Sequence, residues 1–306
     1  MSGNSDKTSA VEGLEIIPTG KALGAEVRGI DFTREVPAET REALKNAWTD
    51  HLVLLFRDQD ITEENHLAAT RVFGETQVGA AKTYIKAAGV KERWATDHPE
   101  ISVIHNLDAD GNPAQDNESL GSGEVVWHSD NSYIEEPPAG SMLLSRVLPP
   151  EGGNTCFSNQ YLTYETLPEE VRNQIEGRTA VQDASRNSAG TLRPGVKLPT
   201  KPSEVPGPHH PLVRTHPISG RKALYLGRRR VYPSQYIDGL EDEESEKLLD
   251  FLWEHACKEE FVWCHVWRPG DMLLWDNRCS MHYREPHAGI HPRVLHRTQI
   301  AGEIPV

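Results

Sequence analysis

This sequence is poor in long hydrophobic runs, in cysteine pairs and in basic relative to acidic residues. No apolar run approaches the roughly 20 residues that a membrane span requires. The polar start of the chain lacks the apolar stretch of a secretory signal, so we expect a disordered tail over residues 1–12 and no membrane association. The four cysteines include no C-x-x-C pair and are too few for a disulfide scaffold, which favours a reducing cytoplasm.

Basic residues are outnumbered, since 46 acidic side chains stand against 32 lysines and arginines and give a formal net charge of −14. A nucleic-acid-binding protein needs a basic surface, so nucleic acid is not expected as a partner. Solubility is a sufficient explanation for the global charge. Arginines beside a candidate site in so acidic a chain would nevertheless concentrate positive charge where small anions bind.

What the sequence does contain is a His128-Ser129-Asp130 triplet and a distant His282. In an extended segment the side chains at i and i+2 point the same way, so His128 and Asp130 can reach one ion together. Two imidazoles and one carboxylate can occupy one face of an octahedral metal, which is the facial triad of non-heme Fe(II) oxygenases. A zinc hydrolase can use the same ligand types, and a lone H-x-D triplet is common by chance. The surrounding motifs must decide.

Short apolar segments separated by glycine and proline predict a mainly β chain with a few surface helices. We expect helices over 37–48, 62–73 and 241–255, two short strands within 14–31, and further strands over 52–56, 101–104, 212–215, 222–226, 272–275 and 293–300. This pattern suits a single sheet-on-sheet domain over residues 13–306. Long insertions at about 79–123 and 183–211 are interpreted as active-site lids.

Six motifs form the context of the triplet. They are WHSDNSY at 127–133, PPAG at 137–140, GGNT at 152–155, WDNR at 275–278, His282-Tyr283 and PRVLHRT at 292–298. In this order and spacing they resemble the taurine dioxygenase and 2,4-dichlorophenoxyacetate dioxygenase superfamily of Fe(II)/2-oxoglutarate oxygenases, from about Leu14 to about Glu303. The resemblance implies an α+β, mainly β fold: a double-stranded β-helix, or jelly roll, with flanking helices.

The resemblance also implies roles for individual residues. His128, Asp130 and His282 would be the iron ligands and the catalytic centre. Arg293 would grip the distal carboxylate of 2-oxoglutarate, because a guanidinium matches a carboxylate with two parallel hydrogen bonds. Thr155 would hydrogen-bond the same carboxylate.

Two weaker predictions concern the substrate. Arg297 shares a strand face with Arg293, and the family's arginine at that position lies near the metal and can contact an anionic substrate group. A surface strand charge is the competing interpretation of Arg297. Asn106 falls roughly where relatives place a polar substrate contact. The basic run Arg228-Arg229-Arg230 is interpreted as a solvated loop or an interface with acids.

By resemblance, the chain would use Fe(II), O2 and 2-oxoglutarate as cosubstrate, release succinate and CO2, and hydroxylate a small organic anion. Sulfonates, alkyl sulfates, aryloxyalkanoates and other carboxylates all remain candidates. A zinc-type metal hydrolase would not need the downstream arginine pair, and a non-catalytic anion-binding jelly roll would not need both the triad and that pair. Relatives are commonly dimers or tetramers, so we expect a homodimer or homotetramer.

Overall fold

The computed structural model of the chain describes residues 11–80, 96–115, 125–186, 192–193, 196–229 and 231–306. Parts of the predicted tail (1–10) and of the two predicted lids (81–95, 116–124, 187–191 and 194–195) lie outside the described residues. The helices are α1 (Ala38–His51), α2 (Glu63–Arg71), α4 (Gln160–Glu165), α5 (Glu169–Ile175) and α6 (Asp242–Ala256), with short 3-10 turns η1 (Pro202–Glu204) and η2 (Glu259–Phe261). The strands are β1 (Glu15–Pro18), β2 (Ala25–Arg28), β3 (Val53–Phe56), β4 (Thr76–Gln77), β5 (Ser102–His105), β6 (Val125–His128), β7 (Gly140–Val147), β8 (Thr155–Asn159), β9 (Thr179–Gln182), β10 (His209–Pro211), β11 (Val213–Thr215), β12 (Lys222–Leu224), β13 (Gln235–Ile237), β14 (Val262–His265), β15 (Met272–Asp276), β16 (Ser280–Arg284) and β17 (Val294–Ile300).

The larger layer is an eight-stranded sheet with the order β1-β2-β3-β15-β7-β17-β4, in which β5 also pairs with β17. Side chains alternate between the two faces of a strand. Accordingly Met142 and Leu144 of β7 belong to a core cluster that includes residues of α1 and α2, whereas Leu143 belongs to a second cluster on the other face. Each face of this sheet is therefore buried against a different layer.

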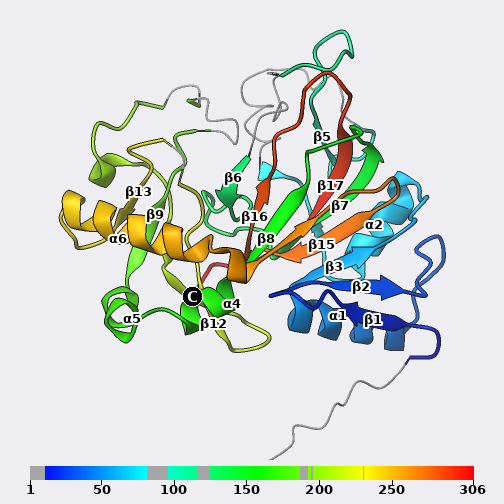
Figure 1. Cartoon of the computed structure of the whole chain (residues 1–306), viewed down its shortest axis with the longest axis horizontal. Helices are drawn as coiled ribbons and strands as arrows, with labels where there is room; N and C mark the ends of the chain where they lie inside the picture. Colours follow the sequence, from blue (N-terminus) through cyan, green and yellow to red (C-terminus); the bar gives the residue numbers. More distant parts are fainter. Residues whose placement is uncertain (1–10, 81–95, 116–124, 187–191, 194–195, 230) are drawn as a thin grey trace, which may run out of the picture.

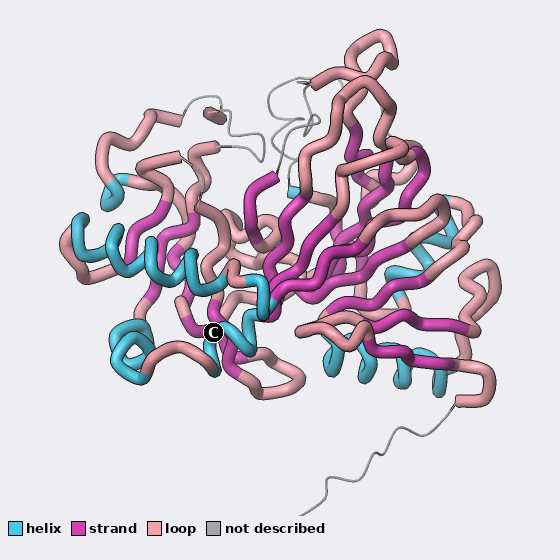
Figure 2. Tube along the Cα trace, viewed as in Figure 1, coloured by secondary structure: helices cyan, strands magenta, loops and turns pink. Residues whose placement is uncertain are grey.

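The second layer is a four-stranded sheet with the order β14-β8-β16-β6. Phe157 of β8 shares a core cluster with Leu143 of β7 and Trp275 of β15, and the Phe157 and Trp275 rings have centroids 5.6 Å apart. Strands run through the middle of the molecule, and helices lie at its periphery (Figure 2). The core between the two sheets is the sheet-on-sheet arrangement that the sequence predicts.

The strand β9 forms a small sheet with β10 and β13, beside which α6 lies. Figure 1 shows α6, β9 and β13 at one end of the molecule and β1, β2 and α1 at the other. The helix α6 starts with a capping box, in which the Glu241 side chain binds the backbone of Glu244 and the Glu244 side chain binds that of Glu241. Its apolar face packs on the small sheet.

The arginines of the basic run beside α6 make different contacts. Arg229 forms ion pairs with Glu246 at 2.6 Å and Asp250 at 2.5 Å, so the predicted interface with acids is confirmed for this residue. Arg228 is buried, and its backbone forms a β-bridge with His128. Residue 230 lies outside the described residues. The Arg228-Arg229 segment therefore connects α6, through the Arg229 ion pairs, to the end of β6, through the Arg228 backbone.

The three predicted helices are observed as α1, α2 and α6. The Thr62 side chain accepts a hydrogen bond from the backbone N–H of Asn65, which confirms the predicted N-cap. Sequence reasoning missed α4, which Asn159 caps by accepting from the backbone N–H groups of Tyr161 and Leu162. Within the described ranges no helix is long and apolar enough to cross a membrane.

The cysteines contain one pairing that the sequence did not indicate. Cys156 of β8 and Cys264 of β14 are cross-strand partners and form a disulfide. Their sequence separation of 108 residues carries no information about the register that brings them together. Cys257 and Cys279 are free thiols.

Candidate metal centre and anion pocket

His128, Asp130 and His282 meet between two adjacent strands. His128 ends β6, and His282 of β16 is its direct register partner. The Nε2 atoms of His128 and His282 lie 3.7 Å and 3.9 Å from Oδ1 of Asp130, which is too long for hydrogen bonds. All three side chains are buried, and their ligand atoms lie within 4.8 Å of one another. The predicted triad therefore forms a donor set that could hold a metal ion.

The protonation states of these side chains suit a cation. Nδ1 of His128 lies 2.7 Å from the carbonyl oxygen of Val126, so a proton on Nδ1 leaves the Nε2 lone pair facing Asp130. Burial and the neighbouring His128 lower the pKa of His282 well below its usual value, which keeps this ring neutral. Burial would raise the pKa of Asp130, but the Arg297 guanidinium and the two histidines outweigh it and hold that pKa well below its usual range. Asp130 is therefore a carboxylate at neutral pH.

Asp130 is held in place by groups outside the triad. The Ser141 hydroxyl donates to Oδ2 of Asp130 at 2.6 Å. Oδ1 of Asn277 accepts from the Asp130 backbone N–H at 3.3 Å and from the Trp275 indole at 2.9 Å, and its Nδ2 donates to the Ser141 hydroxyl at 3.2 Å. Sequence reasoning gave Ser141 and Asn277 no role. The WDNR motif was a signal for Asn277, whereas Ser141 had only its place after the PPAG motif.

Arg297 of β17 faces the same carboxylate. Its Nη1 donates to Oδ1 of Asp130 at 3.0 Å, so its acid partner is one of the predicted iron ligands. Its Nε is buried and has no hydrogen-bond partner among the described residues. The observed contact orients Asp130 and favours its ionised form. The predicted contact of Arg297 with the substrate stays a prediction.

Arg293 lies immediately before β17 and is 2% exposed. Its Nη2 donates to the carbonyl oxygen of Gly153 at 2.9 Å, and its Nε has no partner among the described residues. Burial and the nearby Arg284 lower the pKa of Arg293 to about 9. No carboxylate of the described residues forms an ion pair with this guanidinium. A buried cation without a counter-charge is costly, so these surroundings favour an anion.

Thr155 begins β8 two positions after Gly153, the residue that Arg293 contacts. Its hydroxyl oxygen accepts a hydrogen bond from the Trp267 indole at 3.0 Å. A threonine hydroxyl can accept and donate at once, and no acceptor among the described residues takes its own proton. Trp267 was not singled out in the sequence, and nothing in its local pattern indicated this contact.

The Asn106 side chain binds the backbone next to the Arg293 side chain. Its Oδ1 accepts from the Arg293 backbone N–H at 2.7 Å, and its Nδ2 donates to the carbonyl oxygen of His291 at 3.0 Å. These bonds give Asn106 a role in fixing Arg293. Its predicted contact with the substrate stays a prediction.

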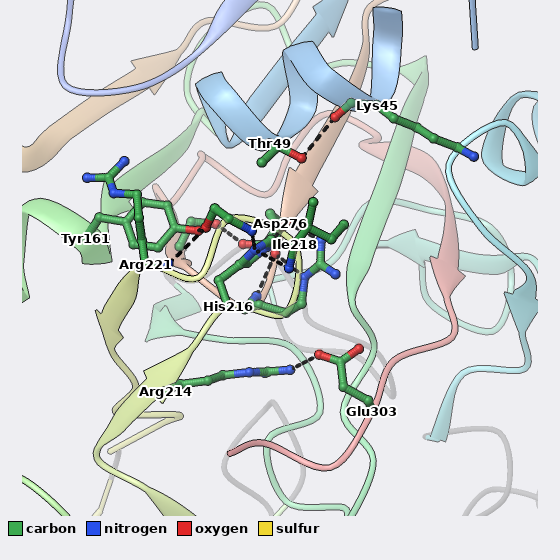
Figure 3. A network of polar contacts seen from close by, with 12 residues as sticks. Lys45, Thr49, Tyr161, Arg214, His216, Ile218, Arg221, Asp276 and Glu303 are labelled. Atoms are coloured by element: carbon green, nitrogen blue, oxygen red, sulfur yellow. Dashed lines mark hydrogen bonds and ion pairs between the residues drawn. The ribbon is translucent and has the colours of Figure 1, made fainter. Parts of the chain in front are cut away.

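A second buried histidine–aspartate group, His216, Asp276 and Cys279, also has its ligand atoms close together. Figure 3 shows His216, Ile218 and Asp276 at the centre of this network, with the Arg214–Glu303 ion pair nearby. His216 Nε2 bonds Oδ2 of Asp276 at 3.1 Å, and its Nδ1 accepts from the backbone N–H of Ile218 at 3.3 Å. Both ring nitrogens are therefore used, which makes this group structural.

Arg278 completes that second group. Its Nε and Nη2 donate to the two oxygens of Asp276 at 2.9 Å and 2.5 Å. Burial would raise the pKa of Asp276, but Arg278 lowers it, and burial with the nearby Asp276 raises the pKa of the Cys279 thiol well above its usual value. The ionised Asp276, which also accepts from the Arg278 backbone N–H at 2.9 Å, fixes the turn between β15 and β16, the strand that carries His282.

Comparison with known proteins agrees with this geometry. The family model described as "Taurine catabolism dioxygenase TauD, TfdA family" matches residues 15–299. The chain is 32% identical to an (S)-phenoxypropionate/alpha-ketoglutarate-dioxygenase of Delftia acidovorans, an alignment that covers 94% of this chain and 95% of that one. It is also 32% identical to an alpha-ketoglutarate-dependent sulfate ester dioxygenase of Pseudomonas putida, with 96% and 91% covered.

A solved structure is similar over nearly the whole length. The crystal structure of AAD-2 in complex with Mn(II) and N-oxalylglycine superposes with a TM-score of 0.78 at 30% identity, covering 95% of this chain and 98% of that chain. That protein binds a divalent metal and an oxalyl-containing dicarboxylate. The likeness extends across both sheets rather than to one motif.

Proposed function

Because the chain belongs to the TauD, TfdA family of dioxygenases, we propose a place in the structure for each part of its reaction. It is a non-heme iron enzyme that uses 2-oxoglutarate as cosubstrate. We assign Fe(II) to His128, Asp130 and His282. The observation that carries the assignment is the convergence of two imidazole Nε2 atoms on one carboxylate oxygen without a hydrogen bond between them.

Arg293 and Thr155 are assigned to the far carboxylate of 2-oxoglutarate. The assignment is supported by a buried guanidinium that has no acid partner in the described part of the chain, and by a hydroxyl whose proton is free to donate. A guanidinium and a hydroxyl together match a carboxylate's two oxygens. Asn106 would act through Arg293, because it binds the Arg293 backbone.

When bound, Fe(II) and 2-oxoglutarate supply the oxidative chemistry, in which O2 is consumed, 2-oxoglutarate becomes succinate and CO2, and a C–H bond is hydroxylated. The residues of this chain orient the reactants. Ser141 and Arg297 fix the two oxygens of Asp130, and the low pKa of Asp130 keeps it a ligand at neutral pH. Both histidines are buried, which limits the access of bulk water to their ring nitrogens.

The primary substrate is proposed to be a small organic anion, in the range of aryloxyalkanoates, sulfate esters and sulfonates. The names of the relatives support this range. Arg297 is the proposed cation for the anionic end of the substrate, since its Nε is not used by the described residues. Loss of one partly desolvated charged contact typically costs about 2 kcal/mol or more, so Arg297→Gln should raise the KM for the best anion by at least about tenfold. An unchanged KM would leave Arg297 with its Asp130 contact alone.

The remaining assignments are supported by architecture or by resemblance. The facing eight-stranded and four-stranded sheets support a double-stranded β-helix core, and we treat residues 13–306 as one domain. A homodimer or homotetramer stays a prediction of the resemblance, and a cytoplasmic location stays a prediction from the cysteine content.

The experiment is a substrate panel read by succinate formation from 2-oxoglutarate with ferrous iron, ascorbate and O2. Sulfonates, alkyl sulfates, aryloxyalkanoates, other carboxylates and an amine control are compared at matched concentration. We expect one anionic class to stimulate succinate formation well above the level without substrate. Stimulation by the amine and by no anion would contradict the substrate assignment. Failure to bind 2-oxoglutarate in the presence of metal would contradict the site assignments.

A further inference from the structure

The segment between β16 and β17 places the imidazole ring of His287 near the Arg293 side chain. Both ring nitrogens of His287 are buried, and neither has a hydrogen-bond partner among the described residues. Leaving such a polar atom unsatisfied in a protein interior is costly. A structural histidine of this chain behaves differently, because both ring nitrogens of His216 are bonded.

The Gly152-Gly153 turn packs against both His287 and Arg293. Both glycines have positive φ, at +76° and +67°. A Cβ on Gly153 would lie 2.8 Å from Nε of Arg293 and 3.5 Å from Cδ2 of His287, and a Cβ on Gly152 would lie 3.2 Å from Cβ of His287. The turn therefore admits no side chain where the histidine and the guanidinium approach it, and it brings both to one place.

The charge around His287 comes from cations. Burial, followed by the guanidiniums of Arg293 and Arg284, lowers the pKa of His287 to about 4. The ring is therefore neutral at physiological pH, with one N–H donor and one acceptor nitrogen. Glu285, two residues before His287, is bonded to another partner, since its Oε2 accepts from Asn154 Nδ2 at 2.7 Å. What this ring lacks is an acceptor for its N–H, and what Arg293 lacks is an anion.

We propose that His287 is a third contact to the far carboxylate of 2-oxoglutarate, to which its neutral ring donates one N–H beside Arg293 and Thr155. The proposal rests on the proposed function, because it takes the Arg293 pocket as the cosubstrate site. Each carboxylate oxygen can accept more than one hydrogen bond, so a third donor does not compete with the other two. His287 would select for a dicarboxylate over a 2-oxo acid of the same length with an apolar end.

The test measures ligand binding by calorimetry on the full chain loaded with Mn(II), which avoids turnover. The ligands are 2-oxoglutarate and 2-oxopentanoate, which share a chain length and differ in the far carboxylate. Weak 2-oxopentanoate binding is measured by competition against 2-oxoglutarate. The variants are His287→Leu, His287→Asn, His287→Gln, and His291→Leu as the control, since the His291 side chain is exposed in the same segment and only its backbone carbonyl, which the variant keeps, contacts Asn106.

For His287→Leu we expect the Kd for 2-oxoglutarate to rise about tenfold or more, the size of a lost hydrogen bond to a charged group, while that for 2-oxopentanoate stays within about twofold. His287→Asn or His287→Gln should recover part of the loss, because each returns an N–H donor. His291→Leu should bind both ligands like the wild type.

Two results would overturn the proposal: an unchanged Kd for 2-oxoglutarate in His287→Leu, or an equal loss for both ligands, which indicates a packing role only. A wild-type protein that binds 2-oxoglutarate no better than 2-oxopentanoate would instead overturn the proposed cosubstrate pocket, and this proposal with it.

Discussion

Two buried groups of metal-ligand side chains lie in neighbouring parts of this molecule. The first is His128, Asp130 and His282, and the second is His216, Asp276 and Cys279. An arginine contacts the aspartate in both groups. In composition the two groups are nearly the same.

They differ in how their ligand atoms are bonded. In the second group the ring nitrogens of His216 and both oxygens of Asp276 are engaged by protein donors and acceptors. In the first group Asp130 also accepts from Ser141 and Arg297, but the Nε2 atoms of His128 and His282 face Asp130 beyond hydrogen-bond distance. A metal entering the second group would have to break several bonds in the protein interior. The bonding of the histidine rings, rather than residue type, therefore separates a structural group from a functional one.

The difference between the two groups is tested most directly by removing one histidine from each group. His282→Ala should reduce turnover to the background level and weaken metal retention, while the melting temperature of the metal-free protein changes little. His216→Ala should lower the melting temperature without abolishing metal binding by the folded fraction. Turnover and differential scanning calorimetry on both variants check this. Full activity in His282→Ala would remove it from the ligand set.

The second group should respond to a change of charge with a loss of stability. Asp276→Asn leaves the buried Arg278 without a counter-charge, which typically costs about 3–5 kcal/mol. Urea unfolding measures the loss. Asp250→Asn is the control, because it removes an exposed partner of Arg229 and should cost less than about 1 kcal/mol. Equal costs for the two variants would show that the Asp276 network is not a buried ion pair in energetic terms.

Loss of the Arg293 guanidinium should weaken ligand binding rather than lower the stability of the fold. Removing a charged partner from a buried carboxylate costs roughly 2–5 kcal/mol, so Arg293→Ala should raise the KM for 2-oxoglutarate by a factor of tens to thousands. The unfolding free energy should change little, because the lost hydrogen bond to the Gly153 carbonyl is offset by the removal of a buried cation that has no acid partner among the described residues. An unchanged KM would indicate that another cation holds the cosubstrate.

The smallest expected effect concerns pH. A proton competes with a metal for a histidine only near or below the pKa of that ring, and the pKa of His282 lies well below 6.5. The pKa of Asp130 is likewise held below its usual range, so His282 and Asp130 both stay deprotonated from about pH 8 to about pH 6.5. The Kd for Mn(II) should therefore change less than about threefold from about pH 8 to about pH 6.5. A tenfold weakening over this window would show that a triad histidine titrates about one pH unit above its ordinary pKa, because a ring with the ordinary pKa changes the Kd only about twofold.

Much of the fold follows from local pattern. The apolar run over 272–275 predicts a strand, and that strand is β15, whose two faces contact different core clusters. Thr62 before an amphipathic run predicts the start of α2. Short elements such as α4 were missed, because a six-residue helix has too few turns to show a period.

The candidate site divides in the same way. The i, i+2 spacing of His128 and Asp130 and the motif around His282 are enough to identify the triad from the sequence. The partners that hold it, Ser141 and Asn277, were not identified, because they reach Asp130 from β7 and from the turn after β15. Both ends of the Asn106 side-chain amide are bonded to backbone next to Arg293, and its predicted contact with the substrate stays a prediction.

The amino-acid sequence alone identifies which side chains can do the chemistry, because ligand type, strand period and motif order are local properties of the chain. Which of those side chains are already bonded depends on the tertiary fold. The pairing of β6 with β16 puts His282 opposite His128, and the pairing of β17 with β7 brings Arg297 to Asp130. Hydrogen-bond partners more than 100 residues apart depend on strand register, and register is set by the packing of the two sheets rather than by any single segment.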